Sequence, residues 1–203
     1  LGQARNNLYL AVKTWAAYIG LYLVFSSQEQ SSPATKAWNQ AVRCAKTLCA
    51  HQTSEGFIPA ILGEGSMAKI IPAIEGLVFL LHWKQTRLVT ETGPFAHLGD
   101  ALRRHLNAIL HTGICRFPDG GWKLSSTNNN SWLSKIYLCQ HVARQIFGFP
   151  ADAKADEAHA AWLLDTDNAF YAWSDQMVCG KAQGSKYYPR GVTSWLWLKE
   201  TRT

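Results

Sequence analysis

Two consecutive stretches decide the fold class: ARNNLYLAVKTWAAYIGLYLVF at Ala4–Phe25 and ATKAWNQAVRCAKTLCAH at Ala34–His51. The first is apolar on most sides, which predicts a helix that is buried on most sides. The second is amphipathic, and Pro33 before it suits the first turn of a helix. Its predicted apolar face consists of Ala37, Ala41, Cys44, Ala45 and Leu48. The pair therefore predicts one inner and one outer helix.

The same alternation continues along the chain. Ile70–Trp83 is almost uncharged and predicts an inner helix, whereas Phe95–Leu110 is amphipathic and predicts an outer helix. The outer helix should carry three basic residues on its solvent side: Arg103, Arg104 and His105. Trp132–Phe147 is the third predicted inner helix, with Ser131 as its N-cap.

The last part of the chain is less regular. Asp152–Leu163 predicts an outer helix with Asp152 near its start. A short helical piece is predicted at Asn168–Met177, and the apolar segment Val192–Leu198 ends the sequence. Short extended pieces are possible at Phe57–Leu62 and Tyr187–Tyr188, without sustained alternation of apolar and polar residues.

Long loops precede the predicted inner helices, at Thr53–Lys69 and Gly113–Ser131. Both exceed the median connection of about 4–6 residues. Long loops at one end of a rigid helical frame usually carry function. We therefore predict an all-α fold: roughly half of an α/α toroid of alternating inner and outer helices, with the long loops on one face. The whole of residues 1–203 is expected to belong to this one barrel domain, and an irregular helical bundle is the alternative.

Composition narrows the class of protein. The net charge of +6 comes from scattered basic residues, without a run suited to nucleic acid. Leu8–Phe25 is apolar, but Lys13 and Thr14 interrupt it, which favours a helix of the protein core over a membrane span. The five cysteines show no zinc-like spacing with histidine, so we expect reduced thiols and a cytoplasmic protein. The seven histidines form no metal-binding motif, and we expect neither a metal nor a cofactor. The chain begins at Leu1, almost inside a helix, so we expect a truncated chain; a processed or tagged one is the alternative.

The loop Arg116–Ser131 has the residues best suited to a ligand. Trp122 can stack on the C–H face of a sugar ring, and Asp119 and Asn128 can bond sugar hydroxyls. The alternative is that Asp119-Gly120-Gly121 is only a turn and the asparagines a solvated loop. Asp175 and Arg190, which stands between Pro189 and Gly191, are two further candidates; a structural salt bridge is the alternative for each.

Glycoside hydrolysis needs two carboxyl groups on opposite sides of the scissile bond. The acidic candidates that we consider in predicted loops or inner helices are Glu64, Glu75, Asp119 and Asp175. Glu75 lies in an apolar helix, so its carboxylate must be paired or face a cavity. The spacing of these four residues does not identify a catalytic pair.

Five strings give the chain a family resemblance. They are LGQARNNLYLAVK, IIPAIEGLVF, DGGWKLSS, NSWLSKIYLCQ and YYPRGVT, at residues 1–13, 70–79, 119–126, 130–140 and 187–193. In this order they are similar to glycoside hydrolase family 52, the β-xylosidases, over nearly the whole chain. The resemblance implies an N-terminal β-sandwich followed by an (α/α)6 barrel, with this chain as the C-terminal portion of the barrel.

The resemblance also implies retaining, exo-acting hydrolysis of xylobiose and short xylo-oligosaccharides to xylose inside the cell. The family's nucleophilic Glu and acid/base Asp should both lie upstream of Leu1, so we assign no catalytic residue here. Loop position gives the predicted substrate-binding residues: Asp119, Trp122, Asn128, Asp175 and Arg190. The parent should bind neither nucleic acid nor membrane, and a homodimer is possible. The alternative function is a non-catalytic helical domain that binds carbohydrate or serves a structural, interaction role.

Overall fold

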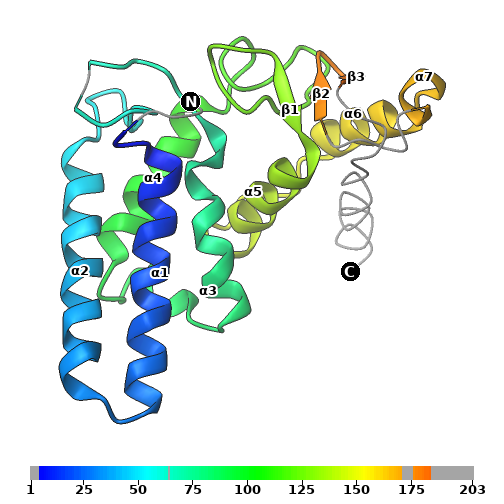
Figure 1. Ribbon diagram of the computed structural model, residues 1–203. Helices are drawn as coiled ribbons and strands as arrows, with labels where there is room; N and C mark the ends of the chain where they lie inside the picture. Colours follow the sequence, from blue (N-terminus) through cyan, green and yellow to red (C-terminus); the bar gives the residue numbers. More distant parts are fainter. Residues whose placement is uncertain (1–4, 64, 171–175, 184–203) are drawn as a thin grey trace. The chain divides into compact units, whose positions relative to one another are not determined.

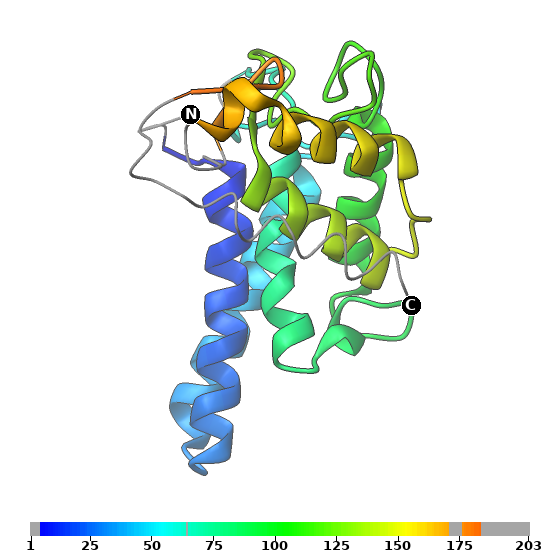
Figure 2. The same ribbon diagram turned by 90° about the vertical axis from the view of Figure 1, so that its right-hand side faces the viewer.

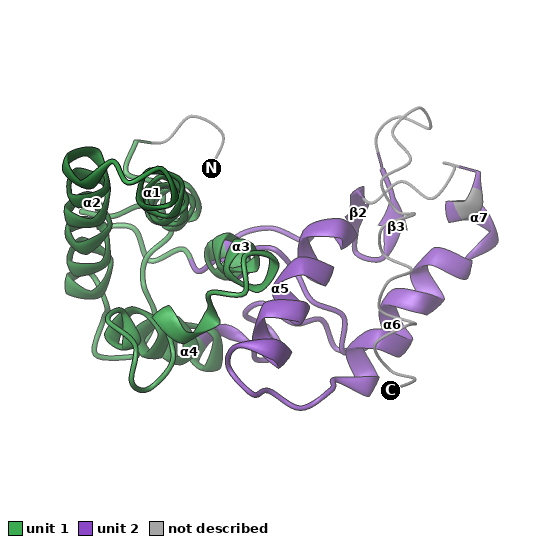
Figure 3. Ribbon diagram, turned by 90° about the horizontal axis from the view of Figure 1, so that it is seen from below, with its two compact units in different colours: residues 1–68, 73–108 green, residues 69–72, 109–203 purple. Residues whose placement is uncertain are grey.

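The computed structural model describes residues 5–63, 65–170 and 176–183. Within these ranges the chain forms seven α-helices, two 3-10 helices and three short strands. Figure 1 labels the α-helices and the strands. It divides into two compact units, coloured separately in Figure 3. Residues 1–68 and 73–108 make up unit 1, and residues 69–72 and 109–203 make up unit 2. The predicted all-α class is confirmed in this general form.

Unit 1 is built on an antiparallel helical hairpin of α1 (Leu8–Ser27) and α2 (Ser31–Ala50). The two helices lie side by side along their length in Figures 1 and 2. The side chain of Asn7 caps α1 by accepting a hydrogen bond from the backbone N–H of Tyr9 at 2.9 Å. The buried residues of α2 confirm its predicted apolar face, except that Cys44 is only half-buried and Ala34 is buried with the others.

The prediction that α1 is buried on most sides is wrong for the described structure. Its buried residues share one face: Leu8, Val12, Trp15, Ala16 and Ile19. Three large apolar side chains of the same helix are exposed: Leu10, Leu21 and Val24. Among the described residues, α1 is also the one helix that is long and apolar enough to cross a membrane. Core helices of soluble proteins can meet the same two criteria.

The predicted inner helix at Ile70–Trp83 is present but divided. A 3-10 helix, η1 (Ile71–Leu77), leads into the short α3 (Val78–His82), and a further 3-10 helix, η2, covers Thr86–Leu88. Gly76 in η1 comes so close to α1 that an added Cβ would stand 3.0 Å from the Val12 side chain and 3.1 Å from the Lys13 backbone nitrogen. The absence of a side chain at Gly76 thus permits this close packing.

Helix α4 (Ala96–Ile109) confirms the fourth predicted helix but corrects one of its residues. Arg103 and Arg104 are exposed as predicted, beside Asp100. His105, which we placed on the solvent side, is fully buried, and its Nδ1 accepts a hydrogen bond from the backbone N–H of Ile58 at 2.9 Å. The imidazole satisfies a donor of the loop before η1, and this bond spans 47 positions of sequence.

Unit 2 contains α5 (Leu133–Gln145), α6 (Ala153–Leu164) and α7 (Thr166–Ala169). Asp152 is the N-cap of α6, because its side chain accepts from the backbone N–H of Ala155 at 3.2 Å. The predicted N-cap role of Ser131 is wrong. Ser131 lies in strand β1 (Asn130–Trp132), and its hydroxyl donates to the carbonyl oxygen of Trp122.

A three-stranded antiparallel sheet is the main departure from the sequence prediction. Strand β2 (Gln176–Val178) pairs with β1 and with β3 (Lys181–Ala182), so Met177 belongs to a strand and not to the predicted helical piece. Cys179 and Gly180 connect β2 to β3 with φ values of 50° and 73°, as a tight two-residue hairpin turn requires.

Phe57–Leu62, described throughout, forms no strand, although Ile61 makes an isolated bridge with Asn7. Tyr187–Tyr188 and Val192–Leu198 lie outside the described residues. All five cysteines are described and are free thiols. The cytoplasmic location stays a prediction.

Candidate functional site

The loop between α4 and β1 contains a tight turn at residues 117–120. The backbone N–H of Gly120 donates to the carbonyl oxygen of Phe117 at 3.0 Å, and that of Phe117 donates to Gly121 at 2.8 Å. Proline in the second position and glycine in the fourth are favoured in a type I turn. The turn that we considered for Asp119-Gly120-Gly121 is therefore present.

Both carboxylate oxygens of Asp119 have partners within the protein. Oδ1 accepts from the backbone N–H of Gly121 at 2.9 Å, and Oδ2 accepts from the indole N–H of Trp162 at 3.0 Å. The carboxylate thus joins the turn to helix α6, although Asp119 itself is exposed at the surface.

Trp162 occupies a slot between two glycines. A Cβ added to Gly121 would stand 2.3 Å from the Trp162 ring, and one added to Gly180 would stand 2.7 Å from its Nε1. Phe117 meets the same indole edge-on, with 5.7 Å between ring centroids. The second glycine of the Asp-Gly-Gly turn is therefore required by the packing of Trp162 against the loop.

Trp122 is buried, with 2% of its surface exposed. Its backbone N–H donates to Nε2 of His159 at 2.9 Å, and its indole N–H donates to Oδ2 of Asp152 at 3.2 Å. His159 is itself buried in α6; burial, and then the nearby charge of Arg116, lower its pKa to about 3. The imidazole is therefore neutral and free to accept the hydrogen bond from Trp122.

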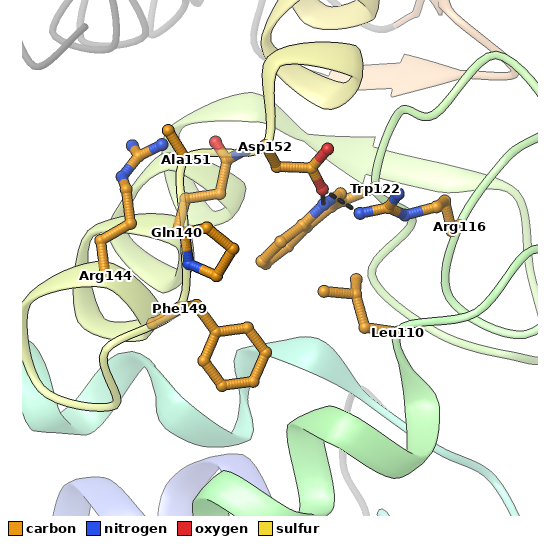
Figure 4. Close-up of a pocket in the computed structure, with 10 residues that line it drawn as sticks. Leu110, Arg116, Trp122, Gln140, Arg144, Phe149, Ala151 and Asp152 are labelled. Carbon is orange, nitrogen blue, oxygen red and sulfur yellow. Dashed lines mark hydrogen bonds and ion pairs between the residues drawn. The ribbon is translucent and has the colours of Figure 1, made fainter.

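Asp152 holds three parts of unit 2 together. One oxygen caps α6, and the other accepts from both the Trp122 indole and the guanidinium of Arg116, as the dashed lines of Figure 4 show. Arg116 and Asp152 form an ion pair with side chains 22% and 19% exposed. This partial burial makes the pair stronger than one on an open surface.

A cavity of about 270 Å³ adjoins this network (Figure 4). Its wall is mainly apolar, with the polar side chains of two arginines, one glutamine and one aspartate. The lining residues are Leu110, Arg116, Trp122, Gln140, Ala143, Arg144, Phe149, Pro150, Ala151 and Asp152. Arg144 lies 3.5 Å from Asp156, and the Gln140 amide donates to the same residue at 3.0 Å. Each arginine of the cavity therefore has its own carboxylate.

The structure brings only some of the predicted site residues together. Trp122 lines the cavity, and Asp119 lies in the adjoining turn. Asn128 is exposed, accepts from the backbone N–H of Asn130 at 3.0 Å and does not line the cavity. Asp175 and Arg190 lie outside the described residues. Substrate contact by these five residues stays a prediction.

Sequence reasoning did not identify the partners of Trp122 as site residues. Asp152 and His159 bond to it from the start and the body of α6, and Arg116, from the same loop as Trp122, pairs with Asp152. Asp152 could be recognised as a helix cap, but its bond to Trp122 joins positions 30 apart. The sequence contains no signal for a contact of that separation.

This arrangement suits binding better than acid–base chemistry. Among the described residues that line the cavity, Asp152 alone has a carboxyl group, and that group accepts three hydrogen bonds. Glu75, the acidic residue of the apolar η1, lies in unit 1 and pairs with Lys13 at 2.8 Å. Among the described residues, no group of three or more His, Cys, Asp or Glu side chains is placed to hold a metal ion.

By its fold and this site, the chain belongs to the class of mostly helical proteins that have a partly apolar cavity beside a loop containing a tryptophan. No family model matches it. Over 203 residues the chain is 55% identical to part of a β-xylosidase from Geobacillus stearothermophilus. The match covers 98% of this chain, and the chain spans 29% of the length of that curated relative. The resemblance to β-xylosidases is thus confirmed, whereas the assignment to family 52 stays a prediction.

Proposed function

We propose that this chain is part of a glycoside hydrolase, a retaining, exo-acting β-xylosidase that releases xylose from xylobiose and short xylo-oligosaccharides. The observation that carries the proposal is the 55% identity to the Geobacillus β-xylosidase, which continues over 98% of the chain. Such a match includes loops as well as helices, so it is more specific than a shared helical architecture.

In this proposal the catalytic carboxyl pair lies in the part of the parent enzyme outside these residues. A retaining glycosidase needs two carboxyl groups about 5–5.5 Å apart, one as nucleophile and one as acid and base. In the cavity, Asp152 is held by Trp122, Arg116 and the start of α6. A carboxylate held by three hydrogen bonds keeps a fixed position, which suits a structural role.

The segment would contribute loops around the sugar. Trp122 supplies an apolar wall of the cavity, and Asp119 fixes the turn that precedes it. Helices α1, η1–α3 and α5 would be inner helices of an (α/α)6 toroid, and α2, α4 and α6 outer helices. The order of helices and long loops along the chain supports this arrangement.

A segment exchange tests the proposal. The matching 29% of the Geobacillus enzyme is replaced by this chain, and hydrolysis of an aryl β-xyloside is measured. We expect the chimera to release xylose, because the exchanged segment should reproduce its contribution to the active site. A chimera that folds, as judged by circular dichroism, yet hydrolyses no xyloside would contradict the proposal.

The same chimera separates the proposed enzyme segment from a binding or structural module. Trp122→Phe keeps an aromatic wall but removes the indole N–H that Asp152 accepts. A contribution of Trp122 to the sugar pocket predicts a raised KM for the xyloside. A loss of thermal stability with unchanged KM would assign Trp122 to packing alone and remove it from the pocket.

A further inference from the structure

Lys123, which follows Trp122 in the loop between α4 and β1, is a buried lysine with 8% of its surface exposed. Its ammonium nitrogen donates to Oδ1 of Asn129 at 3.4 Å and stands 5.6 Å from the centre of the Phe117 ring. Within the described ranges, no carboxylate forms an ion pair with it. Lysine is almost never fully buried in proteins unless it is paired. The described residues therefore lack a counter-charge for this ammonium group.

Three other partly buried cations show what is missing. Each has a carboxylate as its ion-pair partner: Lys13 with Glu75, Arg116 with Asp152, and Arg144 with Asp156. Lys123 instead has a neutral amide oxygen, at a distance beyond the usual upper limit of about 3.2 Å for such bonds. A neutral oxygen at this distance offsets only part of the cost of removing an ammonium group from water.

The neighbouring thiol of Cys115 does not supply the negative charge. Burial raises the pKa of Cys115 to about 12, although the positive charges of Lys123 and Lys69 act to lower it. The thiol is therefore protonated at neutral pH, and it donates to the carbonyl oxygen of Lys69 at 3.8 Å. A thiolate counter-ion for Lys123 is thereby excluded.

Asn129 brings the ammonium group of Lys123 close to the protein surface. Asn129 is exposed, and its carbonyl oxygen accepts from the backbone N–H of Cys179 at 3.1 Å, which ties it to the β2–β3 hairpin. Since its Oδ1 accepts from Lys123, its Nδ2 remains as a donor. An ammonium group and an amide N–H side by side match the two oxygens of a carboxylate, and one ammonium group balances its single charge.

We propose that Lys123 and Asn129 form a binding site for a carboxylate group. The site is separate from the cavity beside Trp122, because neither residue lines that cavity. Two sources of a carboxylate fit this site. One is a uronic acid, free or as a unit of an acidic oligosaccharide, and the other is an Asp or Glu side chain of the parent hydrolase outside these 203 residues. Only the second source rests on the proposed function.

Asn129→Asp tests the site by supplying a carboxylate within the chain. Asn128→Asp, at the preceding exposed position, is the matched control. Thermal unfolding midpoints of the 203-residue chain and its variants are measured in sodium glucuronate, in xylose and in sodium phosphate, with NaCl keeping the ionic strength constant. We expect Asn129→Asp to raise the midpoint by about 2–4 °C and to abolish any response to glucuronate. Asn128→Asp should behave as the wild-type chain does.

Lys123→Met separates the two sources, since it removes the charge and keeps an unbranched side chain. A uronic acid ligand predicts that glucuronate raises the midpoint of the wild-type chain, xylose does not, and Lys123→Met responds to neither. A partner side chain in the parent predicts opposite effects of Lys123→Met in two settings. It raises the midpoint of the isolated chain, where the charge is unpaired, and lowers that of the Geobacillus chimera, where it breaks a buried pair.

Three results overturn the proposal. Phosphate that acts as strongly as glucuronate identifies a general anion effect. Equal midpoints for Asn129→Asp and Asn128→Asp mean that a carboxylate at position 129 gains nothing from Lys123. A midpoint that Lys123→Met raises in chain and chimera alike, without any response to glucuronate, means that the ammonium group is never paired. Xyloside hydrolysis is recorded separately, so an inactive chimera with the expected midpoints contradicts the proposed function and leaves the carboxylate site intact.

Discussion

At the scale of single residues, the Asp-Gly-Gly-Trp sequence combines a predictable turn with an unpredictable contact. Proline and glycine at fixed positions made the turn at 117–120 predictable. The need for glycine at position 121 could not be predicted, because it results from close packing against Trp162, which belongs to helix α6. The same holds for Trp122. Its aromatic character could be read from the sequence, but its bonds to His159 and Asp152 could not.

Gly121→Ala should destabilise unit 2 by about 1–3 kcal/mol, the usual cost of overpacking a close contact. The added methyl group would stand 2.3 Å from the Trp162 ring, so the ring or the turn must move. Urea unfolding followed by circular dichroism measures the change in free energy. The double variant Gly121→Ala/Trp162→Leu is the control, since a smaller side chain at 162 relieves the clash. Losses that simply add in the double variant would show that the two residues are not coupled.

At the scale of elements, helices long enough to show a period were predicted and short strands were not. Helix α2 was predicted to within a few residues because its alanines repeat on one face. Strands β2 and β3 have three and two residues, too few for an alternating pattern. We predicted His105 on the solvent side of α4 because it follows Arg103 and Arg104, which are exposed. Its own side chain is buried and accepts a hydrogen bond from a backbone N–H of the loop before η1.

The contact between α1 and η1 includes an ion pair between Lys13 and Glu75. Lys13 donates to Glu75 at 2.8 Å and to the Tyr9 hydroxyl at 2.7 Å. Burial acts to lower the pKa of Lys13, but the bonds to Glu75 and Tyr9 outweigh it and raise the pKa above its ordinary value. The sequence correctly required a partner for Glu75 without indicating which residue it would be.

Glu75→Ala should therefore destabilise unit 1 by about 1–3 kcal/mol, because it leaves a half-buried ammonium group without its carboxylate. Thermal unfolding measures the loss. Asp100→Ala is the matched control: it removes a carboxylate from an exposed ion pair, for which the expected cost is below about 1 kcal/mol. Equal losses in the two variants would contradict an important role for the Lys13–Glu75 pair.

At the scale of the whole molecule, the sequence predicted a helical protein and its relatives but not its division into two compact units. That division depends on contacts between distant residues, such as Ile71 with Leu124 and Lys69 with Ser126, which place residues 69–72 in unit 2. Local periodicity says nothing about such pairs. The toroid stays a proposal for the same reason, since closure of a ring also depends on contacts between distant residues.

Acid should destabilise the whole molecule through His159. Its pKa is lowered from 6.5 to about 3 in the folded chain, first by burial and then by the charge of Arg116. Between these two values the unfolded chain binds a proton that the folded chain does not, so stability falls as the pH falls. Each pH unit below 6.5 costs about 1.4 kcal/mol, and a change from neutral pH to pH 5 costs about 2 kcal/mol.

His159→Gln isolates this contribution, because a glutamine amide can still accept from the Trp122 backbone N–H but does not titrate. Free energies of unfolding are measured at pH 7 and pH 5 for the wild-type chain and the variant. The variant should lose less stability over this range than the wild type, while His111→Gln, at an exposed position, should keep the wild-type dependence. A wild-type pH dependence in His159→Gln would mean that protonation of His159 does not oppose folding, and the neutral imidazole in the Trp122 network would have to be abandoned.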